Sequence, residues 1–395
     1  MPDSTSPATL LRREDFLDID ATFSEEELAI RDVVRVFVRD RVEPYVADWF
    51  DKGTSPTELM KELGAIGVLG MHLKGYGCAG TSATAYGLAC LELEAGDSGI
   101  RSLVSVQGSL AMFAIHHFGS EDQRERWLPA MAAGEVIGCF GLTEPDAGSD
   151  PGAMRTNAHR DGSDWILNGQ KMWITNGSAA NVAVVWAKTD DGIRGFLVPK
   201  GTKGFATQDI EKKMSLRAST TSELILTDVR LPEDAMLPEA RGLRAPLSCL
   251  DEARYGIVWG VVGAARTCFL SALSYAGERT VFGKAVAGYQ IQQHKLASMA
   301  LAVNRSYLTA RHLGHLKDEG RLRPEQVSMG KLGNVNDALD VARAARQVLG
   351  ANGISLEYPV IRHMANLESV VTYEGTADVH ALVVGGALTG IPAFR

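Results

Sequence analysis

The stretch "SDWILNGQKMWITNG", residues 163–177, marks the change of the chain from helical to β texture. Its apolar segments are short, and the turn pairs Asn168-Gly169 and Asn176-Gly177 interrupt them. Closely spaced strands separated by such turns are typical of antiparallel sheets. The same texture extends from about residue 139 to residue 240, so we predict an antiparallel β domain there.

The segments on both sides of this β region have helical patterns. On the N-terminal side, Ser24 and Glu27 form a capping-box signature ahead of apolar residues at helical spacing. On the C-terminal side, amphipathic stretches run from about residue 245 to the end. We therefore expect an α+β multidomain protein. Its expected parts are an N-terminal arm (1–23), an N-terminal helical domain (24–138), a middle β domain (139–240) and a C-terminal helical part (241–395).

Bulk composition excludes several classes of function. The 395 residues are 45% hydrophobic and 22% charged, which is ordinary for a globular protein. A net charge of −8 argues against a nucleic-acid surface, and no apolar run approaches the length of about 20 residues that spans a bilayer. The five cysteines include no CxxC pair, so we expect no metal site and no disulfide framework. The first 20 residues lack an apolar leader core, so we expect a cytoplasmic protein.

Glu374 is the first candidate for chemistry. It lies in "VVTYEGTADVH", residues 370–380, within an otherwise apolar C-terminal segment. A buried carboxylate without a partner tends to hold a proton, so its pKa rises toward that of a general base working near neutral pH. The alternative is that Tyr-Glu-Gly-Thr forms an ordinary surface turn.

Two loops of the β region carry ligand-binding patterns. "CFGLTEPDAGSD", residues 139–150, offers hydroxyls and glycine-opened backbone to a polar ligand, or is a structural turn. In "KMWITNG", residues 171–177, Trp173 and Thr175 are alternate strand residues and should share one face. An indole beside a hydroxyl suits a flat heteroaromatic ring, although a core tryptophan is the alternative.

Three helical stretches hold further candidates. Arg279 with the glycines of "QVLGANG", residues 347–353, suits a pyrophosphate, although a surface ion pair is the alternative for this arginine. If Arg101 in "DSGIRSLVSVQ" is buried, it needs an anion, either Glu94 or a ligand carboxylate. "CLDEARYGIVWG", residues 249–260, is a ligand contact or a capped helix start with local ion pairs.

Taken together, these stretches resemble the acyl-CoA dehydrogenase family, and among its branches they are most similar to the glutaryl-CoA dehydrogenases. The motifs "GCFGLTEPDAGSDP", "KMWITN", "SLRAST", "ARYGIVWG", "QVLGANGIS" and "TYEGTADVHALVVGGALTGI" occur in the family's order over nearly the whole chain. Ile100, Ala351, Ala377 and Gly386 differ from the residues that this branch usually carries.

The resemblance implies a fold and a reaction. The family fold is a helical domain, a β domain and a C-terminal four-helix bundle, assembled as a homotetramer that is a dimer of dimers. FAD lies between the β domain and the bundle, with help from a neighbouring subunit. Glu374 would remove the α-proton of an acyl-CoA thioester, and an electron-transferring flavoprotein would accept the electrons. Glutaryl-CoA would be oxidised and decarboxylated to crotonyl-CoA; the alternative is another short-chain or dicarboxylic acyl-CoA without decarboxylation.

The resemblance also implies binding residues. Those expected to contact substrate are Arg101, Ser102, Ser105, Ser149, Asp251, Arg254, Tyr255, Tyr373 and Gly375. Those expected to contact FAD are Phe140, Leu142, Thr143, Gly148, Ser149, Trp173, Thr175, Arg279, Phe282, Gln290, Gln347, Gly350, Thr376, Asp378 and Phe394.

Overall fold

The N-terminal layer of the fold is helical, as predicted. The computed structural model describes residues 12–394, so residues 1–11 of the predicted N-terminal arm lie outside it. The side chain of Ser24 accepts a hydrogen bond from the Glu27 backbone N–H, and the Glu27 carboxylate accepts one from the Ser24 backbone N–H, which confirms the capping box. The helices of this layer are α1 (Glu25–Arg41), α2 (Val46–Lys52), α3 (Met60–Ala65), α4 (Ala83–Gly96), α5 (Ser98–Ser105), α6 (Phe113–Phe118) and α7 (Glu121–Ala132). A π-helical segment, Val106–Met112, joins α5 to α6, and a hairpin of β1 (Lys74–Gly75) and β2 (Cys78–Ala79) precedes α4.

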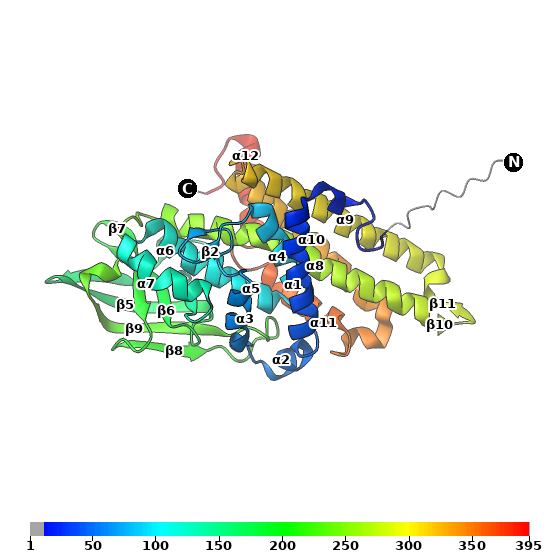
Figure 1. The fold of residues 1–395 in the computed structure, drawn as a ribbon, viewed down its shortest axis with the longest axis horizontal. Helices are drawn as coiled ribbons and strands as arrows, with labels where there is room; N and C mark the ends of the chain where they lie inside the picture. The colour runs from blue at the N-terminus through cyan, green and yellow to red at the C-terminus, as the bar shows by residue number, and fades with distance from the viewer. Residues whose placement is uncertain (1–11, 395) are drawn as a thin grey trace.

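The middle layer is a seven-stranded sheet in the order β3-β6-β4-β5-β9-β8, with β7 paired to β6 (Figure 1). Its strands are β3 (Gly138–Gly141), β4 (Asn157–Asp161), β5 (Asp164–Thr175), β6 (Val182–Thr189), β7 (Gly192–Pro199), β8 (Phe205–Asp209) and β9 (Thr221–Leu231). Most neighbours are antiparallel, as predicted, but β3 pairs with β6 in parallel and β4 meets β6 in parallel at one position. The sheet is therefore mixed. β3 enters from the helical layer rather than through a hairpin, so no tight turn fixes its direction.

The C-terminal layer is helical and is built on α8, which runs from the sheet to the opposite end of the molecule (Figure 1). Its elements are α8 (Arg244–Glu278), the hairpin of β10 (Thr280–Val281) and β11 (Lys284–Ala285), α9 (Gln290–Asp318), α10 (Pro324–Leu349), α11 (Pro359–Val370) and α12 (Ala377–Thr389). Helices α8 to α11 pack against one another, and α12 lies on α10.

Helix α8 is long and apolar, although the sequence analysis expected no segment that could span a membrane. By length and composition it is the one helix of the described residues that could do so. However, 72% of its most apolar 18-residue stretch is buried inside the fold. That burial is typical of a core helix, and no membrane span follows from it.

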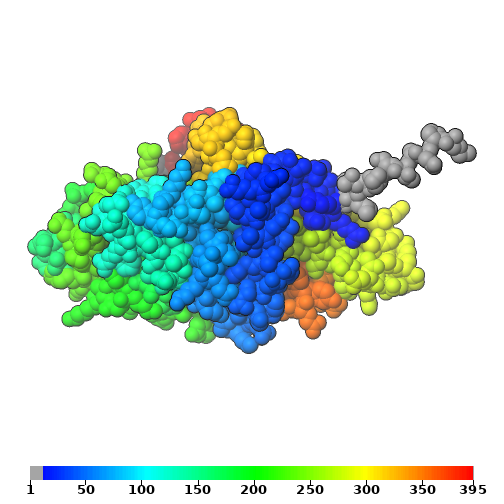
Figure 2. Space-filling view, viewed as in Figure 1, coloured from blue at the N-terminus to red at the C-terminus, as the bar shows by residue number. Residues whose placement is uncertain are grey.

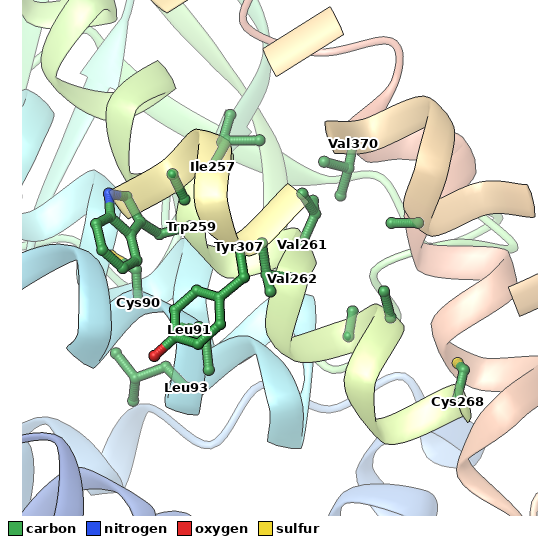
Figure 3. Packing of buried hydrophobic residues seen from close by; sticks show 14 of the residues in the cluster. Cys90, Leu91, Leu93, Ile257, Trp259, Val261, Val262, Cys268, Tyr307 and Val370 are labelled. Atoms are coloured by element: carbon green, nitrogen blue, oxygen red, sulfur yellow. The ribbon is translucent and has the colours of Figure 1, made fainter. Parts of the chain in front are cut away.

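The main core lies where α4 crosses α8. Leu91 and Leu93 of α4 pack with Trp259 and Val262 of α8, and Tyr307 of α9 lies beside them (Figure 3). The described part of the N-terminal arm lies against α9 (Figure 2), where the Tyr307 hydroxyl donates a hydrogen bond to Asp20 at 2.9 Å. From residue 12 onward the arm is therefore part of the packed structure.

Candidate active site

Glu374 lies in the loop between α11 and α12, in an unusual backbone conformation. Its φ is +53°, and Gly375 follows with φ +97°. A non-glycine residue in this region costs about 1 kcal/mol or more, and such strain is common at functional sites. The side chain is partly exposed, but its Oε2 atom is buried and has no hydrogen-bond partner among the described residues. Burial raises the pKa of Glu374, against the opposing effect of nearby cations, so this residue is not an ordinary surface-turn acid.

Two cations, the buried Lys331 and the partly buried Arg254, hold the backbone of this loop. Lys331 of α10 donates from Nζ to the carbonyl oxygens of Tyr373 and Gly375, both at 2.7 Å. Arg254 of α8 donates from Nε to the carbonyl oxygen of Glu374, also at 2.7 Å. All three consecutive carbonyls are thus bound. In contrast, the backbone N–H of Glu374 donates to no acceptor among the described residues.

Lys331 was missed by the sequence analysis, although its signal was present. It lies four residues after Val327 and four before Val335, within the apolar stripe of α10, and is 1% exposed. A lysine on the buried face of an amphipathic helix needs acceptors. Burial lowers the pKa of Lys331, while the carboxylate of Glu374 acts in the opposite direction.

The buried Arg101 pairs with Glu94, one of the two anions that the sequence left open. Its Nε donates to Glu94 Oε2 at 2.7 Å, and its Nη2 donates to the Tyr373 hydroxyl. Its Nη1 is buried and has no partner in the described part of the chain. Glu94 therefore orients the guanidinium without using all of its donors.

Hydroxyl groups surround this guanidinium. The Ser102 and Tyr373 hydroxyls are 3.4 Å apart, and burial raises the pKa of Tyr373 to about 12, so the phenol stays neutral. The Ser105 hydroxyl is buried and has no partner among the described residues. The structure thus brings Arg101, Ser102, Tyr373 and Glu374 together, with unused polar atoms on Arg101, Ser105 and Glu374.

Of the expected residues in the first part of α8, only some lie beside the loop that carries Glu374. Arg254 binds the Glu374 carbonyl and pairs with Asp251 at 2.9 Å. Tyr255, one helix position later, is fully buried and its hydroxyl donates to the Ala83 carbonyl at 2.8 Å. The expectation that Tyr255 contacts substrate is therefore wrong, because its ring faces the α4 core and its one donor is already used.

The strand that carries Trp173 is irregular at that position. The pairing of β5 with β9 shifts register between Lys171 and Ile174, and Trp173 has φ +63°. The shift ends before Ile174, which is buried, whereas Trp173 is exposed and Thr175 partly buried, a pattern consistent with the predicted shared face of Trp173 and Thr175. The Trp173 side chain is 55% exposed, so the alternative of a core tryptophan is wrong. Thr175 is partly buried, and its neighbour Asn176 bonds Thr220.

A buried ion pair fixes the loop at residues 139–150, and the sequence analysis missed it. Lys171 Nζ lies 2.8 Å from Glu144 Oε1, and Glu144 also accepts the backbone N–H groups of Arg155 and Thr156 at 2.6 and 3.0 Å. The side chains of Phe140 and Leu142 are in the core, so mainly their backbone is available to a ligand. Thr143 is partly buried, while Gly148 and Ser149 are exposed on the loop.

A separate group of expected residues lies at the far end of α8. Arg279, Phe282 and Gly350 line a cavity of about 570 Å³ together with Tyr275 and Tyr289. Arg279 forms no ion pair in the described chain, and Phe282 is 95% exposed. Gln290 and Gln347 are exposed near this end and do not line the cavity, and Gln347 accepts a hydrogen bond from Lys295 at 3.3 Å.

The two groups of expected ligand-binding residues do not meet within one chain. Arg254 beside Glu374 and Tyr275 in the cavity are 21 positions apart on α8, about 30 Å at about 1.5 Å per residue. The remaining expected residues lie near α12: Thr376 caps its first turn, Asp378 is exposed in that turn, and Phe394 is half exposed at the C-terminal end.

The fold and this arrangement define a flavin-dependent oxidoreductase, and the chain belongs to the acyl-CoA dehydrogenase family. Models of the N-terminal, middle and C-terminal domains of acyl-CoA dehydrogenase match residues 24–135, 139–229 and 240–389. The human mitochondrial short-chain specific acyl-CoA dehydrogenase is 36% identical over 361 residues, which cover 90% of this chain and 88% of that protein. Proteins of this family use FAD.

Among solved structures, the chain is similar to a glutaryl-CoA dehydrogenase from Mycobacterium smegmatis. One crystal structure of it is 62% identical, with a TM-score of 0.96 over 97% of this chain and 99% of that one. A second, in complex with FADH2, is 59% identical with the same TM-score and coverage. A chain in a structure of the electron transferring flavoprotein of Acidaminococcus fermentans is 34% identical, with a TM-score of 0.90 over 93% of this chain and 98% of that one.

Proposed function

We propose that this acyl-CoA dehydrogenase oxidises glutaryl-CoA and decarboxylates the product to crotonyl-CoA. The observation that carries the proposal is the buried Arg101, which keeps an unused Nη1 donor although Glu94 and Tyr373 bind its other nitrogens. A buried, partly unpaired guanidinium suits a carboxylate ligand. The distal carboxylate of glutaryl-CoA is such a group, whereas butyryl-CoA has none.

Glu374 is the proposed base. Its Oε2 atom is buried and free of hydrogen bonds to the described chain, so it can approach the α-carbon of a thioester. The unused backbone N–H of Glu374 is a candidate donor to the thioester oxygen, where negative charge develops as the proton leaves. FAD, when bound, supplies the oxidation by accepting the β-hydrogen as hydride.

The same side chain serves the second half of the proposed reaction. After oxidation, the bond between C4 and the distal carboxylate breaks, and its electron pair moves toward the thioester. Glu374, now protonated, returns its proton to C4, which gives crotonyl-CoA and CO2. Arg101 holds the carboxylate until the bond breaks, since its guanidinium cannot lose its charge in a protein.

The residues of this chain fit FAD when two copies share it. On β5, the exposed indole of Trp173 suits the flavin ring. At the far end of α8, Arg279 and the open backbone of Gly350 suit the pyrophosphate, because no atom lies within 4 Å of a Cβ built at Gly350. Since the two groups are far apart in one chain, we infer that a neighbouring copy completes each site.

The assembly and the electron acceptor are part of the same proposal. Leu388 and Ile391, at the end of α12 and just after it, are 77% and 71% exposed, which suits an interface between copies. We propose a homotetramer, as a dimer of dimers, that passes its electrons to an electron-transferring flavoprotein. The similarity to a chain in an electron transferring flavoprotein structure supports that acceptor.

Anaerobic mixing of the purified holoenzyme with a panel of acyl-CoA thioesters tests the proposal. We expect glutaryl-CoA to bleach the flavin absorbance faster than butyryl-CoA and to release one CO2 for each crotonyl-CoA formed. Bleaching by butyryl-CoA but not by glutaryl-CoA would assign the enzyme to uncharged short chains. Bleaching by glutaryl-CoA without CO2 would leave a dehydrogenase that does not decarboxylate.

Lys331→Met should move the acidic limb of the pH–rate profile to higher pH by about one unit. Glu374 acts as a base only when deprotonated, and burial raises its pKa while Arg101, Lys331 and Arg254 lower it. Removing the Lys331 charge removes one lowering influence, so a higher pH is needed to ionise the base. The measurement is the rate constant of flavin reduction between about pH 5 and pH 9.

The control for this experiment is Lys203→Met, which removes an exposed lysine of the β domain. It should leave the profile unchanged. Lys331→Gln keeps a hydrogen-bond donor without the charge and should shift the profile in the same direction as the methionine variant. An unshifted profile in both Lys331 variants would show that this charge does not influence the base.

A further inference from the structure

Three glycines line the face of α8 that crosses α4. Gly256, Gly260 and Gly263 are spaced by four and three residues, which places them on one side of the helix. A Cβ atom built at Gly263 would lie 1.9 Å from the backbone oxygen of Leu91. Gly263 therefore serves helix packing, because it allows the two backbones to approach.

Gly260 faces different atoms. A Cβ built there would lie 2.1 Å from Glu94 Oε2 and 3.3 Å from Arg101 Nε. Its nearest neighbours are thus the two partners of the buried ion pair rather than the backbone of α4. The missing side chain at Gly260 provides the space that this ion pair occupies.

Both carboxylate oxygens of Glu94 accept hydrogen bonds inside the core. Glu94 is fully buried, and its second oxygen accepts the Ser98 hydroxyl at 2.8 Å. A methyl group at position 260 would force the carboxylate away from Arg101 Nε, to which it is bonded at 2.7 Å. The guanidinium would then lose the partner that sets its direction beside Tyr373.

We propose that Gly260 determines specificity: by lacking a side chain, it reserves the space in which Glu94 orients Arg101 toward the distal carboxylate of a dicarboxylic acyl-CoA. The inference rests on the proposed function and deepens it. Gly260 is a positioning residue, since it acts through the ion pair and contacts no substrate. A larger residue at this position favours uncharged short-chain substrates.

Gly260→Ala tests the inference, with Gly277→Ala as the matched control. Gly277 lies on the same helix, and no atom lies within 4 Å of a Cβ built there. The measured quantity is kcat/KM for glutaryl-CoA divided by kcat/KM for butyryl-CoA. We expect this ratio to fall at least about tenfold in Gly260→Ala, as when a charge-assisted hydrogen bond is misaligned, and to stay unchanged in Gly277→Ala.

The wild-type ratio separates this inference from the proposed function. A wild-type enzyme that prefers butyryl-CoA overturns the proposed function, whatever the variant does. A wild-type enzyme that prefers glutaryl-CoA, together with a Gly260→Ala ratio within about twofold of it, overturns the inference alone.

A second variant covers the case in which Gly260→Ala fails to fold. Glu94→Ala removes the carboxylate that the new methyl group would meet, so the double variant Gly260→Ala/Glu94→Ala should fold and melt close to Glu94→Ala alone. If the double variant melts well below Glu94→Ala alone, the methyl group clashes elsewhere, and the space at Gly260 is not reserved for the ion pair.

Discussion

Glu374→Gln should reduce the flavin with acyl-CoA substrates at least about 1,000-fold more slowly than the wild type, the range expected when a general base is removed. Glutamine has nearly the same shape as glutamate but cannot accept the α-proton. The loop should remain in place, because Lys331 and Arg254 bind its backbone carbonyls rather than this side chain. Stopped-flow absorbance with glutaryl-CoA and butyryl-CoA measures the effect.

Two controls make this result specific. FAD content and melting temperature of Glu374→Gln should match the wild type, which separates lost chemistry from lost structure. Glu374→Asp keeps a carboxylate that is one methylene shorter and should retain partial activity. A glutamine variant that reduces flavin at close to the wild-type rate would mean that another group removes the proton.

Arg101→Met should lower kcat/KM for glutaryl-CoA by about 100-fold or more and change that for butyryl-CoA by less than about tenfold. The loss is selective because only glutaryl-CoA has a distal carboxylate for the buried guanidinium. The variant should also lose about 3–5 kcal/mol of stability, since it leaves the fully buried Glu94 without its cation. Steady-state kinetics with both thioesters and denaturant unfolding measure the two effects.

A double variant separates the two consequences of this substitution. Glu94→Gln/Arg101→Met removes both charges, and replacing a whole buried ion pair by uncharged groups is often close to neutral for stability. We therefore expect the double variant to regain most of the lost stability while its activity on glutaryl-CoA stays low. Equal losses with both thioesters in Arg101→Met would assign this arginine a purely structural role.

Much of the fold was readable from local sequence patterns. The capping box at Ser24 and the turn at Asn176-Gly177 follow from short-range chemistry, and the structure has both. The predicted turn at Asn168-Gly169 is wrong, because this pair lies inside β5 at a shift in its pairing with β9, which local sequence does not show. Glu374 stood out because a charge within an apolar segment is rare. Arg101 was identified as a residue that would need an anion if buried, and the structure shows that it is buried.

The details that were missed depend on contacts between distant segments. The register shift in β5 arises in its pairing with β9, so strand alternation alone did not predict the left-handed backbone of Trp173. Tyr255 was expected at the substrate because its motif resembles the family's, yet one helix position after Arg254 its side chain is turned toward α4. Lys331 lies 42 residues before the first carbonyl that it binds, and no local pattern shows that separation.

The attachment of the Glu374 loop has a consequence for how such a site diversifies. Lys331 and Arg254 donate hydrogen bonds to main-chain carbonyl oxygens, which every amino acid possesses. The side chain at position 373 can therefore be exchanged while the backbone that carries Glu374 keeps its shape. New substrate preferences can arise on this loop without rebuilding the anchor that aims the reacting group.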